Sequence, residues 1–484
     1  MIASPEYPDW ADVQRLAVRG YNLERSRHFV LQVKNPAGAR DFLADLVQMG
    51  VVTDASVDNG SVKLRKDRGC CPANIGFTFR GLEKLQLPLP YLRVFQEKAQ
   101  AFADGAYPRA AQRLADTGAS APQWWDECFQ PGHAHVILSV YADGERELDL
   151  FTEALKQIPG AAGLDGWKAA LDGCHLSADR KRRTAHFGFR DGISNPAIKG
   201  FHLREPAPRS QHAAGEFVLG YENDDKFNPW LLVNPGPSSN PWLPPSARIR
   251  PQFFRNGSFA AFRKIEQHEA EFRAFVADAA AKLGETPEYV KAKLAGRWDD
   301  GSVVQPGQKR APVPASGADG RPHSADLDNF DFSRDPNGEG CPFGAHIRRM
   351  NPRADAVVPF RRRPLIRRGM PYGPSFDIAR EAKRGLLGLF FCASLEDQFE
   401  HLLAQWGNAN PMGPDNRGNA KDPLIGNHEN PGAVFDIPVQ GERWSQLDGF
   451  TPFVTTRGTL YAFYPGLAAL RTLARVDTPA HDEA

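Results

Sequence analysis

Apolar residues along the chain follow two spacings in turn, and this predicts strands that are followed by helices. Short runs rich in β-branched and aromatic residues are typical of strands, whereas apolar residues at every third or fourth position are typical of one helix face. In the first half, the strand-like segments are residues 28–33, 74–79 and 133–142. The helix-like segments that follow them are residues 37–50, 81–85 and 146–158.

The second half repeats this alternation. Its strand-like segments are residues 258–263, 386–392 and 459–463. Its helix-like segments are residues 266–283, the segment that begins after the N-cap residue Ser394, and residues 467–473. Three strand–helix units in each half predict a duplicated α+β architecture, with helices on one face of antiparallel sheets.

A proline-rich stretch separates the two halves. Residues 222–251 contain seven prolines, and neither a helix nor a central strand tolerates that density. We therefore place a boundary near residues 205–225 and predict an N-terminal domain of residues 1–210 and a C-terminal domain of residues 211–484. A second irregular stretch, residues 298–340, is long enough that we expect a functional loop there.

Composition indicates where in the cell the protein is located and argues against some classes of binding partner. The 484 residues carry 59 lysines and arginines against 58 acids, a net charge of +1, which argues against a general nucleic-acid binder or a polybasic membrane binder. The six cysteines include no CxxC pair, which argues against a zinc ribbon. No secretory signal and no membrane-spanning apolar run is visible, so we expect a cytoplasmic protein.

The near-neutral total hides a local concentration of positive charge. Eight arginines fall within residues 348–368, where Asp355 is the only acid. A solvated face or a nucleic-acid patch would also use arginines, but this cluster is interrupted by apolar residues such as Val357 and Phe360. A compact ligand with two negative charges would be bound well by such arginines.

Two further segments could carry chemistry, although each has a simpler interpretation. Residues 188–192, GFRDG, place Asp191 between glycines that permit close backbone approach to a ligand, but Asp-Gly is also a common turn pair. Residues 367–374, RRGMPYGP, form a charged segment before the apolar run 385–392. Taken alone, residues 188–192 are interpreted as a turn. We interpret residues 367–374 as a charged turn that leads into the strand 385–392, and these two segments together as the polar edge and the apolar wall of one pocket.

In combination these motifs resemble the dye-decolourising peroxidase family. The GxxDG motif of that family matches residues 188–192, CPFGAHIRRMNPR at residues 341–353 matches the segment that carries its histidine, and RRGMPYG at 367–373 matches its arginine segment. The supporting matches lie at residues 74–82, 215–221, 256–267, 292–301 and 453–467. Three site motifs in the right order, with flanking matches in both halves, make the resemblance specific.

The resemblance implies a fold, a cofactor and an activity. The fold would consist of two ferredoxin-like domains of the dimeric α+β barrel type, and the second would hold most of a non-covalent haem b. The activity would be a peroxidase that uses hydrogen peroxide to oxidise bulky aromatic donors, such as dyes and phenolics. Two such domains could also pair into a homo-oligomer.

By motif position, the resemblance also assigns roles to residues. His346 would be the iron ligand, Asp191 the acid–base residue on the open side of the haem, and Arg367 its neighbouring arginine, with Arg368 as the alternative. Asp422 is a candidate acceptor for the second nitrogen of His346. The residues implied to contact the haem are Arg348, Arg349 and Arg353 at the propionates and Leu389 and Phe391 over the open face.

Alternatives to this interpretation stay open at this point. A haem-binding or haem-handling protein with little turnover would share His346 but would not need Asp191 or Arg367. A structural or nucleic-acid-binding protein would use only the arginine cluster. Within the peroxidase interpretation, Trp406, Tyr461 and Tyr464 are either relays to the surface for bulky dyes or, more simply, core aromatics.

Overall fold

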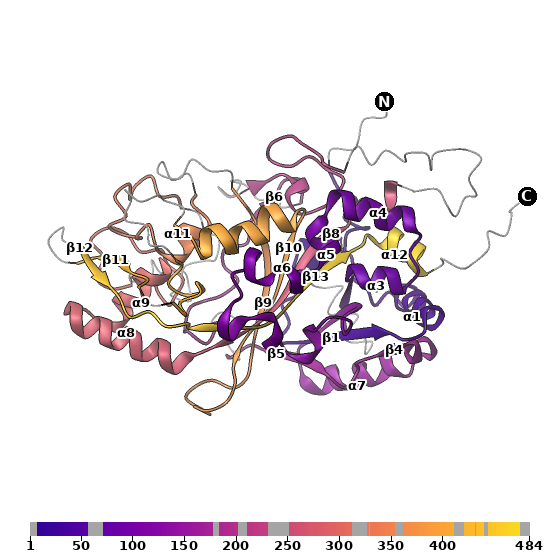
Figure 1. Cartoon of the computed structure of the whole chain (residues 1–484), viewed down its shortest axis with the longest axis horizontal. Coiled ribbons are helices and arrows are strands. Elements are labelled where there is room, and N and C mark those ends of the chain that lie inside the picture. The colour runs from indigo at the N-terminus through magenta and orange to yellow at the C-terminus, as the bar shows by residue number, and fades with distance from the viewer. Residues whose placement is uncertain are drawn as a thin grey trace, which may run out of the picture.

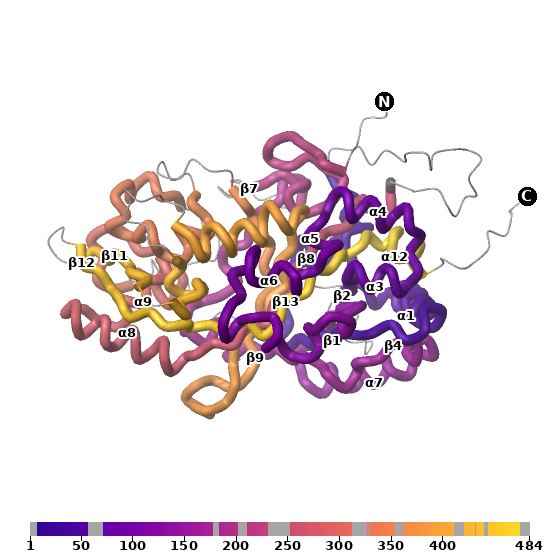
Figure 2. Tube along the Cα trace, viewed as in Figure 1, coloured from indigo at the N-terminus to yellow at the C-terminus, as the bar shows by residue number. Residues whose placement is uncertain are grey.

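The structure is a computed structural model of the whole chain, and it shows the elements of the first half at one end of the molecule (Figure 1). It describes residues 7–56, 71–177, 183–201, 211–230, 251–311, 327–328, 330–353, 362–410, 421–430, 432–439 and 444–474. Helices α8, α9 and α11 and strands β11 and β12 lie at the opposite end, while the C-terminal helix α12 returns to the first half (Figures 1 and 2).

Within these residues, nine strands form one sheet. Its order is β4-β1-β3-β2-β13-β8-β10-β9, with β5 paired to β1, and all of its pairs are antiparallel. The bounds are β1 Arg25–Val33, β2 Ala73–Phe77, β3 Val136–Ala142, β4 Leu164–Asp165, β5 Ala170–Cys174, β8 Ser258–Gln267, β9 Ile366–Tyr372, β10 Gly385–Cys392 and β13 Val454–Tyr464. Two small sheets pair β6 Ala197–Ile198 with β7 Gln211–His212, and β11 Phe435–Pro438 with β12 Trp444–Leu447.

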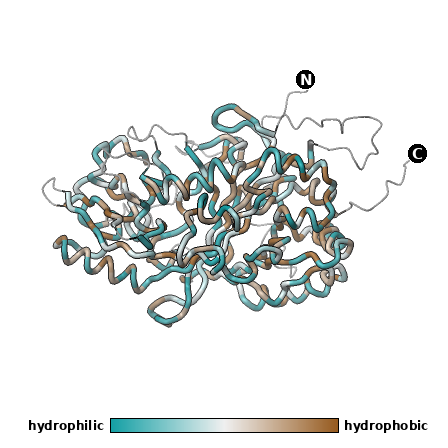
Figure 3. Tube along the Cα trace, viewed as in Figure 1, coloured by the Kyte–Doolittle hydropathy of each residue, from teal (hydrophilic) through white to brown (hydrophobic). Residues whose placement is uncertain are grey.

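Polar side chains cap the first turn of several helices. Asn35 caps α1, Thr286 caps α9 and Ser394 caps η11, each by accepting a hydrogen bond from a backbone N–H of the first turn. Hydrophilic and hydrophobic residues alternate along α8 in Figure 3, as expected for a helix with one buried face. The bounds are α1 Pro36–Gln48, α3 Phe79–Lys84, α4 Leu89–Lys98, α5 Gln100–Asp104, α6 Ala106–Arg113, α7 Glu145–Lys156, α8 Glu269–Leu283, α9 Pro287–Ala295, α11 His346–Met350, η11 Leu395–Glu400, η12 Leu402–Gly407 and α12 Leu467–Ala474.

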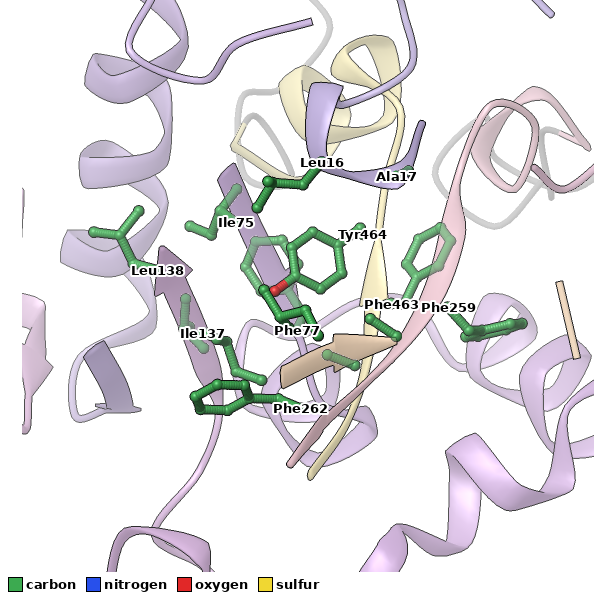
Figure 4. Close-up of a cluster of buried hydrophobic side chains, with 14 of the residues drawn as sticks. Leu16, Ala17, Ile75, Phe77, Ile137, Leu138, Phe259, Phe262, Phe463 and Tyr464 are labelled. Carbon is green, nitrogen blue, oxygen red and sulfur yellow. The ribbon is translucent and has the colours of Figure 1, made fainter. Parts of the chain in front are cut away.

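The two halves of the sheet are joined where β2 meets β13. Phe77 of β2 and Phe463 of β13 are directly paired, and both lie in the cluster of buried side chains drawn in Figure 4. Phe262 of β8 belongs to the same cluster, and its ring lies 5.0 Å from the ring of His28 on β1. One core therefore packs strands of the second half against strands of the first.

Alternation along β10 gives this strand two different faces. Leu389 is paired with Phe262, and the ring of Phe391 lies 4.9 Å from that of Tyr464, so this face belongs to the shared core. Leu386, Gly388 and Phe390 point to the opposite face, because successive side chains of a strand alternate. That opposite face is the one available to build a site.

The α+β class predicted from the sequence is confirmed, and the predicted strands and helices match observed ones to within a few residues. One element differs: residues 367–374 were interpreted as a turn, whereas Ile366–Tyr372 is strand β9. Pro371 is accommodated because β9 lies at the end of the strand order, where a missing donor costs least. The division into residues 1–210 and 211–484 stays a prediction.

No helix among the described residues is long and apolar enough to cross a membrane.

The core also contains a histidine whose titration will limit stability in acid. His28 is buried on β1, and burial lowers its pKa to about 4. Between that value and the ordinary pKa of about 6.5, the unfolded chain binds a proton that the folded chain does not, so the free energy of unfolding falls as the pH falls. The full difference corresponds to roughly 3 kcal/mol.

We therefore expect His28→Gln to lose less stability than the wild type between pH 6.5 and pH 4. Urea unfolding at several pH values measures this difference. His133→Gln, at a half-exposed histidine, serves as the control and should follow the wild type. Equal acid sensitivity of His28→Gln and the wild type would contradict the assignment.

Candidate functional site

A cavity of about 330 Å³ lies against the free face of β9 and β10. Its apolar lining consists of Ile265, Ile347, Met350, Leu365, Leu386, Phe390, Phe399, Leu402, Leu403, Trp406, Ile425 and Val454. Its ionisable lining consists of Asp191, His212, Arg263, Arg297, His346, Arg353, Arg362, Arg363, Arg367 and Arg368. The cavity is therefore an apolar slot whose lining is rich in arginine and has one carboxylate, so it suits a largely apolar ligand with negative groups. Arg263, Arg297, Arg353 and Arg363 also pair with acids outside the lining.

His346 reaches this cavity from the start of α11. Its Nδ1 lies 2.8 Å from Oδ2 of Asp422, and its side chain is 25% exposed, whereas that of Asp422 is 0% exposed. A carboxylate in this position fixes the proton on Nδ1 and the orientation of the ring. Nε2 is then the ring nitrogen that is left to ligate a metal.

Asp422 is held by the surrounding backbone as well as by His346. Its Oδ1 accepts hydrogen bonds from the backbone N–H groups of Leu424 at 2.9 Å and Ile425 at 3.0 Å. Burial raises the pKa of this carboxyl, but His346, the charge of Arg349 and the backbone donor outweigh it, and the net pKa is lowered. Asp422 is thus an ionised acceptor, as the sequence analysis anticipated.

Asp191 lies on a tight loop shaped by its two glycines. Gly188 and Gly192 have φ angles of +83° and +73°, which glycine adopts without strain. The backbone N–H of Gly192 donates to Oδ1 of Asp191 at 2.7 Å. A Cβ built on Gly369 of β9 would lie 3.3 Å from Oδ2, so the second carboxylate oxygen faces the cavity strand and is available for chemistry.

Strand alternation separates the two candidate arginines. Arg367 is paired with Phe390, on the cavity face, and its Nη2 donates to the Ser194 carbonyl at 2.6 Å and to Ser194 Oγ at 2.8 Å. Arg368 also borders the cavity, but it is paired with Leu389, on the core face, and its Nε donates to the carbonyl of Leu16 at 3.0 Å. Arg367 is therefore the arginine whose guanidinium stands beside the Asp191 loop.

Of the other predicted arginines, only Arg353 lines the cavity. Arg348 is buried, donates to the carbonyl of Cys341 at 2.8 Å and pairs with Asp335. Arg349 is also buried, and it donates to the backbone carbonyls of Trp406 and Ala409. The structure thus corrects the prediction for Arg348 and Arg349, whose guanidinium groups hold loops together.

Arg362 and Arg363 line the cavity instead. Both belong to the arginine cluster at residues 348–368. The sequence analysis favoured Arg348, Arg349 and Arg353 as haem contacts because they follow His346 closely, and it gave no reason to choose the more distant Arg362 and Arg363. All of residues 362–365 line the cavity. With Arg353, they give the cavity three cations on neighbouring segments.

The predicted wall residues Leu389 and Phe391 are also corrected. Both are buried in the shared core and neither lines the cavity. The cavity wall is formed by Leu386, Gly388 and Phe390, one position away along the same strand. A shift of one residue exchanges the faces of a strand, because its side chains have a period of two.

Two glycines face each other on this wall. Gly388 of β10 is directly paired with Gly369 of β9, and both line the cavity. A side chain at either position would project into the slot, and a Cβ on Gly388 would come within 2.8 Å of the Phe390 ring. The pair therefore keeps the wall flat.

The aromatic residues considered as surface relays are all buried. Trp406 is 3% exposed and lines the cavity, while Tyr461 and Tyr464 are 2% and 1% exposed. The hydroxyl of Tyr461 donates to Glu400 at 3.0 Å. The simpler interpretation as core aromatics fits these positions, and none of the three is a surface residue.

Comparisons with known proteins point in one direction. No protein-family model matches the chain. The chain is 29% identical to the multifunctional dye peroxidase DyP2 of an Amycolatopsis species, over 96% of this chain and 95% of that protein. It is 28% identical to Peroxidase 2 of Mycetinis scorodonius, over 83% of this chain and 76% of that protein.

A similar solved structure is that of an ancestral D-type dye-decolorizing peroxidase, with a TM-score of 0.76 and 26% identity. The match covers 96% of this chain and 99% of that one. The likeness therefore extends over both halves of the sheet and over the loops that build the cavity.

Proposed function

Because the chain belongs to the dye-decolourising peroxidase family, we propose that it is a haem peroxidase that oxidises bulky aromatic donors, such as dyes and phenolics, by one-electron steps with hydrogen peroxide. The observation that carries the proposal is a single cavity that brings together a carboxylate-backed His346, Asp191 and Arg367. Each of the three comes from a different segment of the chain, so their convergence is a property of the fold.

The residues present fit a non-covalent haem b. A planar macrocycle requires apolar walls, which the flat Gly369–Gly388 surface and its aliphatic and aromatic neighbours supply. Two propionates require cations, and Arg353, Arg362 and Arg363 would hold them. Two of these arginines have a protein partner as well, Arg353 at Asp328 and Arg363 at Asp397. His346, with Nδ1 engaged by Asp422, would hold the iron through Nε2.

When bound, haem supplies the iron centre at which peroxide is reduced and through which electrons are drawn from the donor. The chain supplies the proton chemistry. Oδ1 of Asp191 is occupied by the N–H of Gly192, so Oδ2 would take a proton from one peroxide oxygen and return it to the other. Arg367, oriented by Ser194, would stabilise the negative charge that develops on the departing oxygen.

One spectroscopic experiment tests the proposal. The purified, haem-loaded protein should show a Soret band that shifts rapidly on mixing with hydrogen peroxide and returns when a dye or a phenol is added. A Soret band that peroxide leaves unchanged would favour the haem-handling alternative. A protein that takes up no haem would contradict both.

A variant of Asp422 tests the support of His346. Asp422→Asn keeps the shape of the side chain but removes the charge that makes His346 a strongly donating ligand. We expect a higher reduction potential of the bound iron and a loss of peroxidase activity of about 10- to 100-fold, as is typical for residues that support metal ligands.

Spectroelectrochemistry measures the potential of Asp422→Asn, and steady-state turnover measures its activity. Asp436→Asn, at a half-buried acid of β11, is the control and should leave both unchanged. A wild-type potential in Asp422→Asn would show that the carboxylate does not act through His346.

A further inference from the structure

His212, which lines the same cavity, forms a second imidazole–carboxylate pair with Asp224, and this pair takes no part in the steps above. We propose that this pair is the route by which protons pass between solvent and the cavity. The inference rests on the proposed peroxidase function and extends it to the supply of protons. It follows from the position, the burial and the hydrogen bonds of the two side chains.

The pair stands on the Asp191 side of the cavity. The chain runs from Asp191 through Ser194 and Pro196, both in the lining, into β6. Strand β6 pairs in parallel with β7, and Ile198 is the partner of His212. Figure 1 labels β6 and Figure 2 labels β7 in the same upper part of the molecule. His212 therefore belongs to the same wall as the loop that carries the acid–base residue.

The two side chains span the distance from the cavity to solvent. The side chain of His212 is only 4% exposed, whereas that of Asp224 is 31% exposed. Nδ1 of His212 lies 2.5 Å from Oδ2 of Asp224. One end of the pair thus borders the cavity and the other end touches water.

The geometry of the pair is fixed by its neighbours. Oδ1 of Asp224 accepts the backbone N–H of Ala213 at 2.7 Å, and the backbone N–H of Asp224 donates to Glu216 Oε1 at 3.1 Å. Burial raises the pKa of the Asp224 carboxyl, but its hydrogen bonds with His212 and Ala213 and the charge of Lys199 lower that pKa by more. The net pKa is below the ordinary value, so the carboxylate is ionised. Besides His212, the ionisable groups that act on or contact Asp224 are therefore Lys199 and Glu216.

A comparison with the other pair in the cavity clarifies the difference in role. His346 and Asp422 have the same kind of contact, Nδ1 to a carboxylate oxygen, at 2.8 Å. Asp422, however, is 0% exposed, so that pair has no contact with solvent at its far end. A histidine–aspartate pair with its histidine in the cavity lining thus occurs twice. The buried pair, His346 with Asp422, orients an iron ligand, whereas the pair of His212 with Asp224 extends to solvent.

The reaction requires such a supply of protons. Reduction of one hydrogen peroxide to two waters consumes two electrons and two protons. Asp191 can only move a proton that is already in the cavity, and a donor that delivers electrons alone brings none. Nε2 of the protonated ring would release its proton to the cavity. A proton from water would then reach Asp224 and pass to the ring nitrogen that has lost its proton, once the ring has turned that nitrogen toward Asp224. The pair thereby regains both its original charge and its original protonation.

The test uses the haem-loaded wild type, His212→Phe and Asp224→Asn with ferrocyanide, a donor that carries no proton. Ferricyanide formation is followed by absorbance, and proton uptake is followed in parallel with a pH-indicator dye in weak buffer. We expect the two variants to slow both signals about 10-fold or more, in the lower range for acid–base groups. Asp225→Asn, at the adjacent exposed acid, is the matched control and should behave as the wild type.

Small acids distinguish a proton route from a structural role. Raising acetate from low to high concentration at constant ionic strength should restore part of the rate in His212→Phe and Asp224→Asn, because acetic acid can carry protons into the cavity, and should not change the wild type. Ferrocyanide turnover and proton uptake at the wild-type rate in Asp224→Asn would overturn the inference, as would a slowed rate that acetate does not change. Failure of the proposed function itself would appear differently, as a wild-type protein without turnover.

Discussion

Replacing His346 by alanine is expected to abolish the Soret band and the peroxidase activity of the purified protein together. His346 is the only histidine of the described cavity lining whose Nδ1 is bound to a fully buried carboxylate, and its Nε2 is the ring nitrogen left for iron. Without it, the slot retains apolar walls and cations, but no strong ligand for the metal. The absorbance ratio of the Soret band to the protein band, and turnover with a dye and peroxide, measure the two losses.

The control for this variant is His133→Ala, which removes a half-exposed histidine outside the cavity lining. It should leave the haem content and turnover unchanged. Circular dichroism of both variants establishes that the sheet is retained. A Soret band of wild-type position and intensity in His346→Ala would show that another residue holds the iron.

Replacing Asp191 by asparagine is expected to lower kcat/KM for hydrogen peroxide by about 100- to 10,000-fold, the range typical of a lost acid–base group. The amide has nearly the same shape and can still accept the N–H of Gly192, so the loop and the haem site should persist. What it cannot do is take a proton at the position of Oδ2. The Soret band should therefore remain while its change with peroxide becomes slow.

The rate of that spectral change against peroxide concentration measures the effect. Asp299→Asn is the matched control, since Asp299 is a half-exposed acid whose backbone carbonyl contacts the same loop at Arg190. Equal losses in both variants would indicate damage to the loop and not a missing base.

The sequence predicts the regular parts of this fold better than the shape of its site. Strands β1, β8, β10 and β13 follow from runs of β-branched and aromatic residues, because both of their faces are buried. Strand β9 escaped prediction because arginine, glycine and proline interrupt any apolar pattern. The presence of arginine, glycine and proline in this strand is understood only from the structure, in which one face of β9 borders the cavity and the other faces the edge of the core.

Within the site, motif positions led to three residues that line one cavity, Asp191, His346 and Arg367, but not to most of the residues that surround them. The contact between His346 and Asp422 joins residues 76 positions apart. The sequence offers Asp422 as a candidate acceptor, but no spacing rule links two residues that far apart. Alternation along β10 correctly places Leu389 and Phe391 on the same face of the strand. It does not tell which of the two apolar faces packs against the core. The sequence likewise cannot distinguish an arginine that binds a ligand from one, such as Arg349, that binds backbone carbonyls.

The two faces of β10 have a consequence for attempts to redesign the protein. Leu389 and Phe391 contribute to the core that the two halves share, whereas Leu386, Gly388 and Phe390 shape the slot. Substitutions at alternate positions of one strand should therefore divide into those that alter folding and those that alter which molecules are accommodated. A directed-evolution library restricted to 386, 388 and 390 would explore donor preference while the stability of the scaffold is largely left alone.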